Sequence, residues 1–325
     1  MAQNSATYDT YDQIGIREDL ENAIYNIAPW ETPFMSMIDR MKAENTLHEW
    51  QTDSLDSPGT NAQVEADDVT FSTLSPTVRL SNRTQIFRKD VVISGTSRAV
   101  KTAGREDELP YQLAKKGKAL KTDIEYALIR NQKLDAGSSA TARTLGSVES
   151  WLSSNYTKQT TGNTTSTTAG YSSGALAAPV DGTSATTTFS ESSLRTVMQT
   201  AWNNGGAPTI VMVGPFNKGV VSKNFTGIAT QYRENSGVKP ATILGAAGIY
   251  VSDFGELKIV PSRIMRERTA LMLDMEYWAV ASLRPIKQVE IARTGDADKQ
   301  ILITELTLVS KNEKASGKVV DMASS

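Results

Sequence analysis

The sequence contains no cysteine and only one histidine, His48, among its 325 residues. The absence of cysteine excludes a disulfide framework, a thiolate zinc site and a cysteine nucleophile. A single histidine excludes a histidine-rich metal cluster and argues against histidine-based acid–base catalysis. We therefore expect no catalytic, cofactor or metal site and no enzymatic activity.

Long hydrophobic runs are also missing. No apolar stretch approaches the roughly 18–20 residues that a membrane-spanning helix needs. The first residues, MAQNSATYDTYDQ, lack the basic start and the apolar stretch of a secretory signal. We expect an unexported protein with no membrane partner.

Motifs for chemistry are few and weak. No phosphate-binding loop, dinucleotide fingerprint or nucleophile elbow occurs, and GPFNKG at 214–219 has the wrong register for a phosphate loop. Asp274 and Glu276 could form a carboxylate pair on one strand face, which leaves an enzyme as an alternative, although such acids are usually solvated or salt-bridged. The tryptophans Trp50, Trp202 and Trp278 are predicted to anchor the core.

The net charge of −2 hides a strong asymmetry along the chain. Residues 1–80 carry a net charge of −10 and residues 81–133 a net charge of +6. These segments could be solvated faces, or they could contact each other between copies of a self-associating subunit. The basic run KKGK at 115–118 could alternatively contact phosphates, so a DNA-binding protein is a further alternative.

The first half of the chain reads as two extended arms and a helix. Residues 1–45 become apolar around Trp30 and Phe34 without a clear period, which indicates an arm that buries side chains against another surface. Residues 46–98 predict a protruding β-hairpin with an acidic tip at Glu65, Asp67 and Asp68. Residues 105–133 predict a long helix, with apolar residues at helical spacing and Gly117 marking close packing or a bend.

The second half changes character twice. Residues 135–188 are rich in serine and threonine, which predicts a surface insertion or a flexible excursion that buries little. From 189 the pattern is α/β, with a helix capped by Ser190 and stopped by Gly205 and Gly206. Two long strands, 286–293 and 299–312, then form a hairpin through TGDAD.

This order of parts resembles the HK97-type major capsid fold of tailed phages, and more closely the SU10-type family of major capsid proteins. The segments that carry the resemblance cover about half of the chain and lie toward both of its ends: FMSMIDRMKAENTLHEWQTDSL (34–55), RTQIFRKDVVISGTSRAVKTAGREDELPYQLAKKGKALKTDIEYALI (83–129) and YWAVASLRPIKQVEIARTGDADKQILITELTLVSKNEKASGKVVDM (277–322). The region between 135 and 270 resembles the family only loosely.

The resemblance implies an α+β fold with named parts. These are an N-terminal arm (1–45), an E-loop hairpin (46–98), a P-domain with its spine helix (99–134), the Ser/Thr-rich insertion (135–188), an A-domain (189–285), and P-domain return strands with a C-terminal tail (286–325).

The resemblance also implies the function and the partners. The chain would be a major capsid protein whose pentamers and hexamers form the icosahedral head shell around double-stranded DNA, assembled in the host cytoplasm. Partners would be a portal protein, a separate scaffold, a decoration protein, and the packaged DNA through non-specific contact. An encapsulin-like shell of a cellular compartment has the same fold and is the alternative.

We expect contacts between subunits rather than a pocket to carry the function. Our own inference from the charge pattern is that the acidic tip docks on basic residues of a neighbour. The expected contact residues are Glu65, Asp67, Asp68, Lys115, Lys116, Lys118, Trp30 and Phe34.

Overall fold

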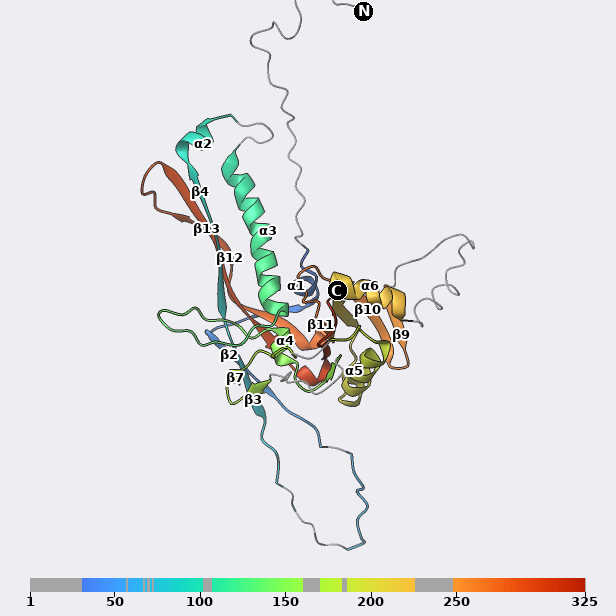
Figure 1. Cartoon of the computed structure of the whole chain (residues 1–325). Helices are drawn as coiled ribbons and strands as arrows, with labels where there is room; N and C mark the ends of the chain where they lie inside the picture. The colour runs from blue at the N-terminus through green and yellow to red at the C-terminus, as the bar shows by residue number, and fades with distance from the viewer. Residues whose placement is uncertain are drawn as a thin grey trace, which may run out of the picture.

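The computed structural model describes residues 31–56, 58–66, 68, 71, 73–101, 107–159, 170–182, 186–225 and 248–324. A long four-stranded sheet runs beside one long helix, and a six-stranded sheet lies beside the lower end of that unit (Figure 1). A two-stranded ribbon, formed by β2 (Leu47–Thr52) and β3 (Val78–Arg83), projects in the opposite direction from the long sheet. The architecture is α+β, as the sequence predicts.

The long sheet is built mainly from the chain's last hairpin. Its strands, in spatial order, are β1 (Asp39–Lys42), β12 (Trp278–Ile291), β13 (Ala297–Ser310) and β4 (Gln85–Ser94). β1 pairs with β12 in parallel, and the other neighbours are antiparallel. The turn through TGDAD is confirmed. β4, expected in the projecting hairpin, instead pairs along its whole length with β13, so the free ribbon is shorter than predicted.

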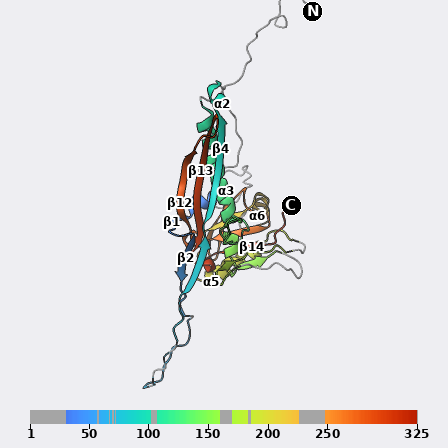
Figure 2. The same ribbon diagram turned by 90° about the vertical axis from the view of Figure 1, so that its left-hand side faces the viewer.

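The long helix α3 (Glu108–Ile129) covers one face of this sheet (Figure 2). It begins where the Asp107 side chain accepts a hydrogen bond from the Leu109 backbone N–H at 3.1 Å, which caps the helix. The predicted apolar stripe is confirmed: Leu120, Ile124 and Leu128 are fully buried. A short helix, α2 (Gly95–Ala99), follows β4.

The six-stranded sheet separates two cores. Its strands, in spatial order, are β5 (Tyr156–Lys158), β14 (Gly317–Val320), β11 (Thr269–Leu273), β8 (Ile210–Val213), β10 (Gly255–Pro261) and β9 (Ile249–Ser252). The helices α5 (Glu191–Asn203) and α6 (Pro215–Asn224) pack on one face. The other face, with Met212 and Leu271, joins the core beneath α3. Ser190 caps α5 and Gly205, at φ +83°, follows its end, as predicted.

Two segments contribute more to the two hydrophobic cores than the sequence indicates. The C-terminal stretch 317–320, expected as part of a tail, is strand β14 inside the six-stranded sheet. Within the Ser/Thr-rich region, Leu145, Val148 and Trp151 are buried, and Trp151 stacks on Tyr171 with ring centroids 5.3 Å apart. The expectation that this region buries little is wrong for its described residues, because its apolar side chains are concentrated around the short helix α4 (Val148–Trp151).

The tryptophans behave differently from one another. Trp278 is fully buried and Trp50 is half-buried, but Trp202 is 56% exposed and contacts only Phe254 among aromatic rings in the described part of the chain. Its prediction as a core anchor is wrong, because more than half of the residue remains exposed. The remaining elements are α1 (Pro33–Met37), β6 (Tyr171–Ser172), β7 (Ala175–Leu176), η1 (Met275–Tyr277) and η2 (Glu313–Ala315).

A buried carboxylate fastens the arm where its described part begins. The two side-chain oxygens of Glu125, on α3, accept hydrogen bonds from the backbone N–H groups of Phe34 and Met35, each at 2.8 Å. Glu125 is fully buried, and among the described residues no charged side chain offsets its burial. Desolvation raises the pKa of Glu125 to about 7, although the two backbone hydrogen bonds oppose the shift.

Gly117 lies in the middle of α3 with room for a methyl group. A Cβ built there would lie 3.9 Å from the Leu302 side chain, an ordinary van der Waals contact. Gly117→Ala should therefore raise the free energy of unfolding of the isolated subunit by about 1 kcal/mol, the helix-propensity difference between the two residues. Denaturant unfolding followed by circular dichroism measures it.

Gly206 is the matched control because there a Cβ would lie 2.5 Å from the Ala315 backbone. Gly206→Ala should lower the free energy of unfolding by about 1–3 kcal/mol, as overpacking does. Equal effects at the two positions would contradict the packing described here.

The stability of the subunit should fall as Glu125 ionises. Its folded pKa of about 7 lies above the ordinary value of 4.5, so the folded state binds the proton more tightly. Stability from this group is therefore complete at low pH and is lost as the pH rises from about 4.5 to 7, by on the order of 3 kcal/mol. The Glu125→Gln variant should lose this dependence, and unfolding free energies of both proteins across pH 5–8 test it.

The exposed Glu65 provides the control. Glu65→Gln should leave the pH dependence of the wild type unchanged. Parallel stability curves for the wild type and Glu125→Gln would show that the arm is not held by a titrating group.

Candidate functional site: inter-subunit surfaces

The described residues contain no group of three or more metal-ligating side chains. No helix among them is long and apolar enough to cross a membrane. Asp274 and Glu276 do not act as a pair. Asp274 is buried and accepts hydrogen bonds from the backbone N–H groups of Ala207 and Glu276, whereas the Glu276 side chain is exposed. Asp274 thus holds the short turn before β12.

His48 lies on β2 of the projecting ribbon. Its ring centroid is 5.9 Å from that of Trp50, and partial burial lowers the pKa of the imidazole below its ordinary value. The structure therefore gives the histidine a packing role beside Trp50 in the ribbon.

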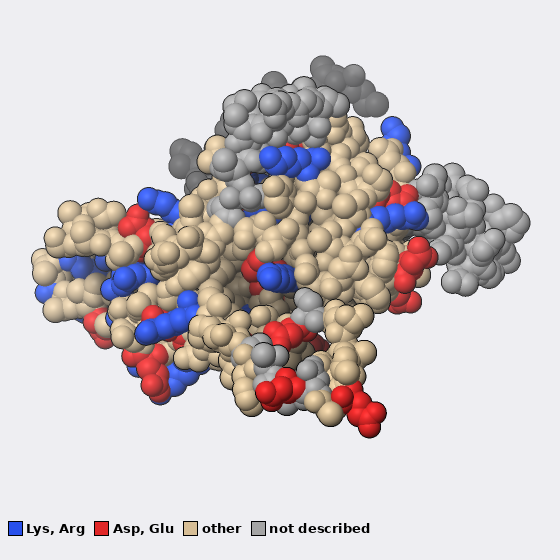
Figure 3. Space-filling view, turned by 90° about the horizontal axis from the view of Figure 1, so that it is seen from below, with Lys and Arg blue, Asp and Glu red and all other residues tan. Residues whose placement is uncertain are grey.

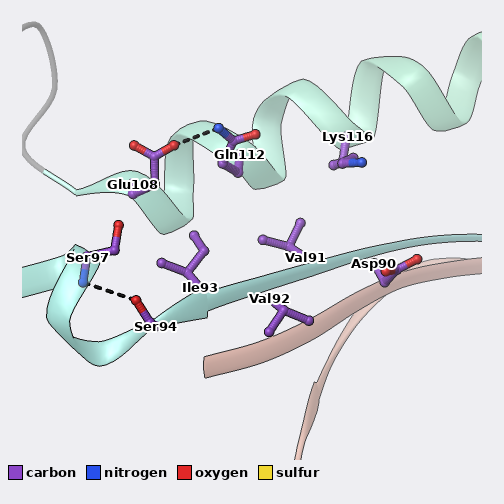
Figure 4. A pocket seen from close by; sticks show the side chains of 9 residues that line it. All are labelled: Asp90, Val91, Val92, Ile93, Ser94, Ser97, Glu108, Gln112 and Lys116. Atoms are coloured by element: carbon purple, nitrogen blue, oxygen red, sulfur yellow. Dashed lines mark hydrogen bonds between the residues drawn. The ribbon is translucent and has the colours of Figure 1, made fainter. Parts of the chain in front are cut away.

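An open groove of about 590 Å³ lies between β4 and the first turns of α3 (Figure 4). Its lining is mixed: Val91 and Ile93 from the strand, and Glu108 and Gln112 from the helix, joined by a 2.6 Å hydrogen bond. Lys116, one of the predicted contact residues, lines this groove rather than the outer side of the helix.

The ribbon continues into a connection, residues 53–77, that we call the tip segment. No described residue of it belongs to a helix or strand. Glu65 and Asp68 are exposed on it, as predicted, and Ala66 turns the chain at φ +64°. Asp67 lies outside the described residues. In the view from below, carboxylates gather around this projection (Figure 3).

The tip segment also carries large apolar side chains, which were not among the contact residues predicted from the sequence. Leu55, Phe71 and Leu74 are 98%, 93% and 89% exposed, and Val64 is 78% exposed. The available signal was their presence in a stretch with no strand or helix pattern to bury them. Exposed apolar side chains on a projecting segment indicate a contact with another molecule.

The root of the ribbon is held firmly to the body. The Asn82 side chain donates to the Gly146 and Leu308 carbonyls at 3.1 and 2.7 Å and accepts from the Gly146 N–H at 2.8 Å. Trp50 Nε1 donates to the Ser310 carbonyl at 2.8 Å. These bonds fix the direction in which the tip segment projects.

A buried ion cluster fixes the bend between β3 and β4. Glu305 accepts hydrogen bonds from Thr84 and Arg143, each at 2.7 Å, and forms an ion pair with Arg284 at 2.8 Å. Glu305 is almost fully buried, so two guanidinium groups and a hydroxyl satisfy a carboxylate that would otherwise be costly to bury. Ribbon and long sheet therefore keep one relative orientation.

The predicted contact residues divide into separate groups. Lys115 and Lys118 are exposed on α3, on the body, while Glu65 and Asp68 lie on the tip segment, so one chain does not bring them together. Trp30 lies outside the described residues. Phe34 is fully buried and meets Trp278 edge-to-face at 6.5 Å. Its prediction as an inter-subunit contact is wrong, because it belongs to the subunit's own core.

The sequence is similar to that of a capsid protein. The chain is 27% identical over 356 residues to the major capsid protein of Escherichia phage Phieco32, an alignment that covers 97% of this chain and 96% of the relative.

Solved structures agree on the fold. The capsid asymmetric unit of Cyanophage A-1(L) superposes with a TM-score of 0.67 at 10% identity, covering 97% of this chain and 99% of that one. A structure of Phage G gp27 major capsid proteins and gp26 decoration proteins gives 0.53 at 10% identity, covering 99% and 100%. The fold is thus the HK97-like capsid fold, and no finding favours the alternative of a cellular compartment.

The SU10 major capsid protein family matches residues 2–323, nearly the whole sequence. The chain belongs to this family: it is a phage major capsid protein, a structural component of the virion that forms a shell from copies of itself.

Proposed function

We propose that the subunit builds a closed icosahedral shell of pentamers and hexamers through arms that reach neighbouring copies. The observation that carries this proposal is the tip segment, which projects from the body of the subunit (Figure 1) and carries large apolar side chains that are 78–98% exposed. A monomer gains nothing from such exposure, whereas a neighbour in a shell can cover it.

The mechanism is geometric. A contact between an arm and a different surface of the next copy is heterologous, so it extends from copy to copy and closes only when the rotation between copies allows. Each subunit makes several such contacts at once, and their combined strength exceeds that of any single one. The role is structural and needs no catalytic residue.

The other partners are inferred from the family. A portal protein and a separate scaffold, with assembly in the host cytoplasm, rest on the resemblance to tailed-phage capsid proteins. A decoration protein is proposed by analogy with the Phage G structure, which contains gp26 decoration proteins. Packaged double-stranded DNA would be held by non-specific contact, since phosphate attraction needs no sequence-reading site.

Electron microscopy of the purified protein tests shell formation. The wild type should form closed particles, and Glu65→Lys combined with Asp68→Lys should reduce particle yield about tenfold or more, because like charges then meet across the contact. The circular dichroism of the unassembled variant should match the wild type, since both residues are exposed.

The neutral pair Glu65→Gln with Asp68→Asn is the graded control and should reduce yield less than the reversed pair. A wild type that never assembles would contradict the proposed shell. A normal particle yield from the Glu65→Lys, Asp68→Lys variant would contradict a role of the acidic tip in assembly, but it would not contradict the proposed shell.

A further inference from the structure

Four aromatic rings from distant parts of the sequence lie in a row at the inner end of the ribbon. His48 and Trp50 belong to β2, whereas Trp151 belongs to α4 and Tyr171 to β6, both within the Ser/Thr-rich insertion. The centroids of successive rings are 5.9, 5.5 and 5.3 Å apart, and the planes of Trp151 and Tyr171 lie within 8° of parallel. Ring pairs at these distances attract each other beyond the effect of their burial.

The insertion contacts both strands of the ribbon. Figure 1 shows α4 and β7 beside the inner ends of β2 and β3. Trp151 packs on Trp50 of β2, and the Tyr171 hydroxyl lies 2.9 Å from the hydroxyl of Ser81 on β3, within hydrogen-bond distance. Ser81 is buried by this contact region although it belongs to a projecting ribbon. The insertion therefore holds the ribbon by apolar stacking and by a polar contact at the same time.

Tyr171 is held in place by its own tight hairpin. β6 and β7 pair Tyr171 with Leu176, and the two turn residues, Ser173 and Gly174, have φ values of +49° and +84°. Positive φ at both central residues is the geometry of a two-residue hairpin turn. Leu176 is buried, and its carbonyl accepts a hydrogen bond from the Leu134 backbone N–H at 2.9 Å. The position of Tyr171 is thus fixed by backbone pairing that does not involve the ribbon.

The insertion is fastened to the six-stranded sheet through Glu149. This buried carboxylate accepts hydrogen bonds from Arg266 at 2.9 Å and from Thr269 of β11 at 3.0 Å. Lys318 Nζ, from β14, donates to the Glu149 backbone carbonyl at 2.8 Å. Trp151, two residues further along α4, contacts the ribbon. One short helix therefore connects the six-stranded sheet to the inner end of the ribbon.

We propose that the Ser/Thr-rich insertion is a brace that fixes the direction of the ribbon relative to the six-stranded sheet, with Trp151 and Tyr171 as its positioning residues. This inference rests on the proposed shell and gives the insertion a part in assembly. The long sheet holds the ribbon through the carbonyls of Leu308 and Ser310, and the brace adds a second point of attachment. Two points of attachment resist a pivoting motion that one would permit. Because a heterologous contact closes a shell only at a suitable rotation between copies, the direction of the ribbon matters for closure.

Spin labels on engineered cysteines measure the direction of the ribbon, because the natural chain has no cysteine. Val78→Cys at the outer end of β3 and Lys258→Cys on β10 both replace exposed residues. Double electron–electron resonance on the unassembled subunit should give one narrow distance distribution for this pair. Tyr171→Ala should broaden or shift the distribution, because the contacts with Trp151 and Ser81 are both lost.

Three controls separate the brace from general stability. Tyr156→Ala removes a partly exposed tyrosine of β5, whose ring lies 5.9 Å from Lys158 Nζ, and should leave the Val78–Lys258 distribution unchanged. Tyr171→Phe keeps the ring and should broaden the distribution less than Tyr171→Ala. Labels at Lys258→Cys and Lys287→Cys, one on each sheet, should report the same distance with and without Tyr171→Ala.

Ser81→Ala removes the same hydroxyl contact from the side of the ribbon. It should match Tyr171→Phe, and the two changes combined should have no more effect than either alone, as expected when both remove one interaction. Effects that add would show that the two hydroxyl groups do not act on each other. This pair also decides the question if Tyr171→Ala proves unable to fold.

Particle assembly provides the functional readout. Tyr171→Ala should lower the yield of closed particles several-fold, while the circular dichroism of its unassembled subunit matches the wild type. An unchanged Val78–Lys258 distribution in this variant would overturn the brace. A broadened distribution with a normal yield of closed particles would overturn its part in assembly. A wild type that forms no particles would instead refute the proposed shell and leave the distance measurements valid, so the two failures are distinguishable.

Discussion

The main constraint on this subunit is that it cannot bury its own projecting apolar surface. Phe71, Leu74 and their neighbours stand clear of the body, and the polar contacts of Asn82 and Glu305 prevent the ribbon from folding back. Apolar area left in water is unfavourable in proportion to its extent, at roughly 25 cal/mol per Å². Covering these exposed apolar side chains therefore favours assembly. The contacts of Asn82 and Glu305 at the root of the ribbon determine where a neighbour can cover them.

Regular periodicity made parts of the fold predictable from sequence. α3 combines an N-cap at Asp107 with apolar residues at helical spacing, and the last two strands alternate around a short turn, so local pattern and tertiary position agree. The C-terminal strand β14 was missed because its four residues, one of them Lys318, are too few to show an alternating pattern. The core residues near Trp151 were missed because the helix α4 is a single turn and too short to show a helical pattern. Their placement depends on partners outside any local window, such as Tyr156 for Lys318 and Trp50 for Trp151.

The contact residues were harder still to predict. A run of carboxylates can be recognised in a sequence, so the acidic tip was predicted. The sequence does not show which of two phenylalanines, Phe34 or Phe71, is buried and which is exposed. Phe34 is buried against Trp278, and Phe71 is 93% exposed. The exposure of Phe71 follows from the direction in which the ribbon projects, and the burial of Phe34 follows from its contact with Trp278.

The two arms are anchored by different chemistry. At the ribbon, Glu305 is buried against Arg143 and Arg284, so its charge is balanced within the subunit. At the N-terminal arm, Glu125 accepts hydrogen bonds from the backbone N–H groups of Phe34 and Met35, and burial raises its pKa to about 7. Near neutral pH the attachment of the N-terminal arm therefore responds to protons through Glu125, while the cluster that aims the ribbon has its charge compensated by cations.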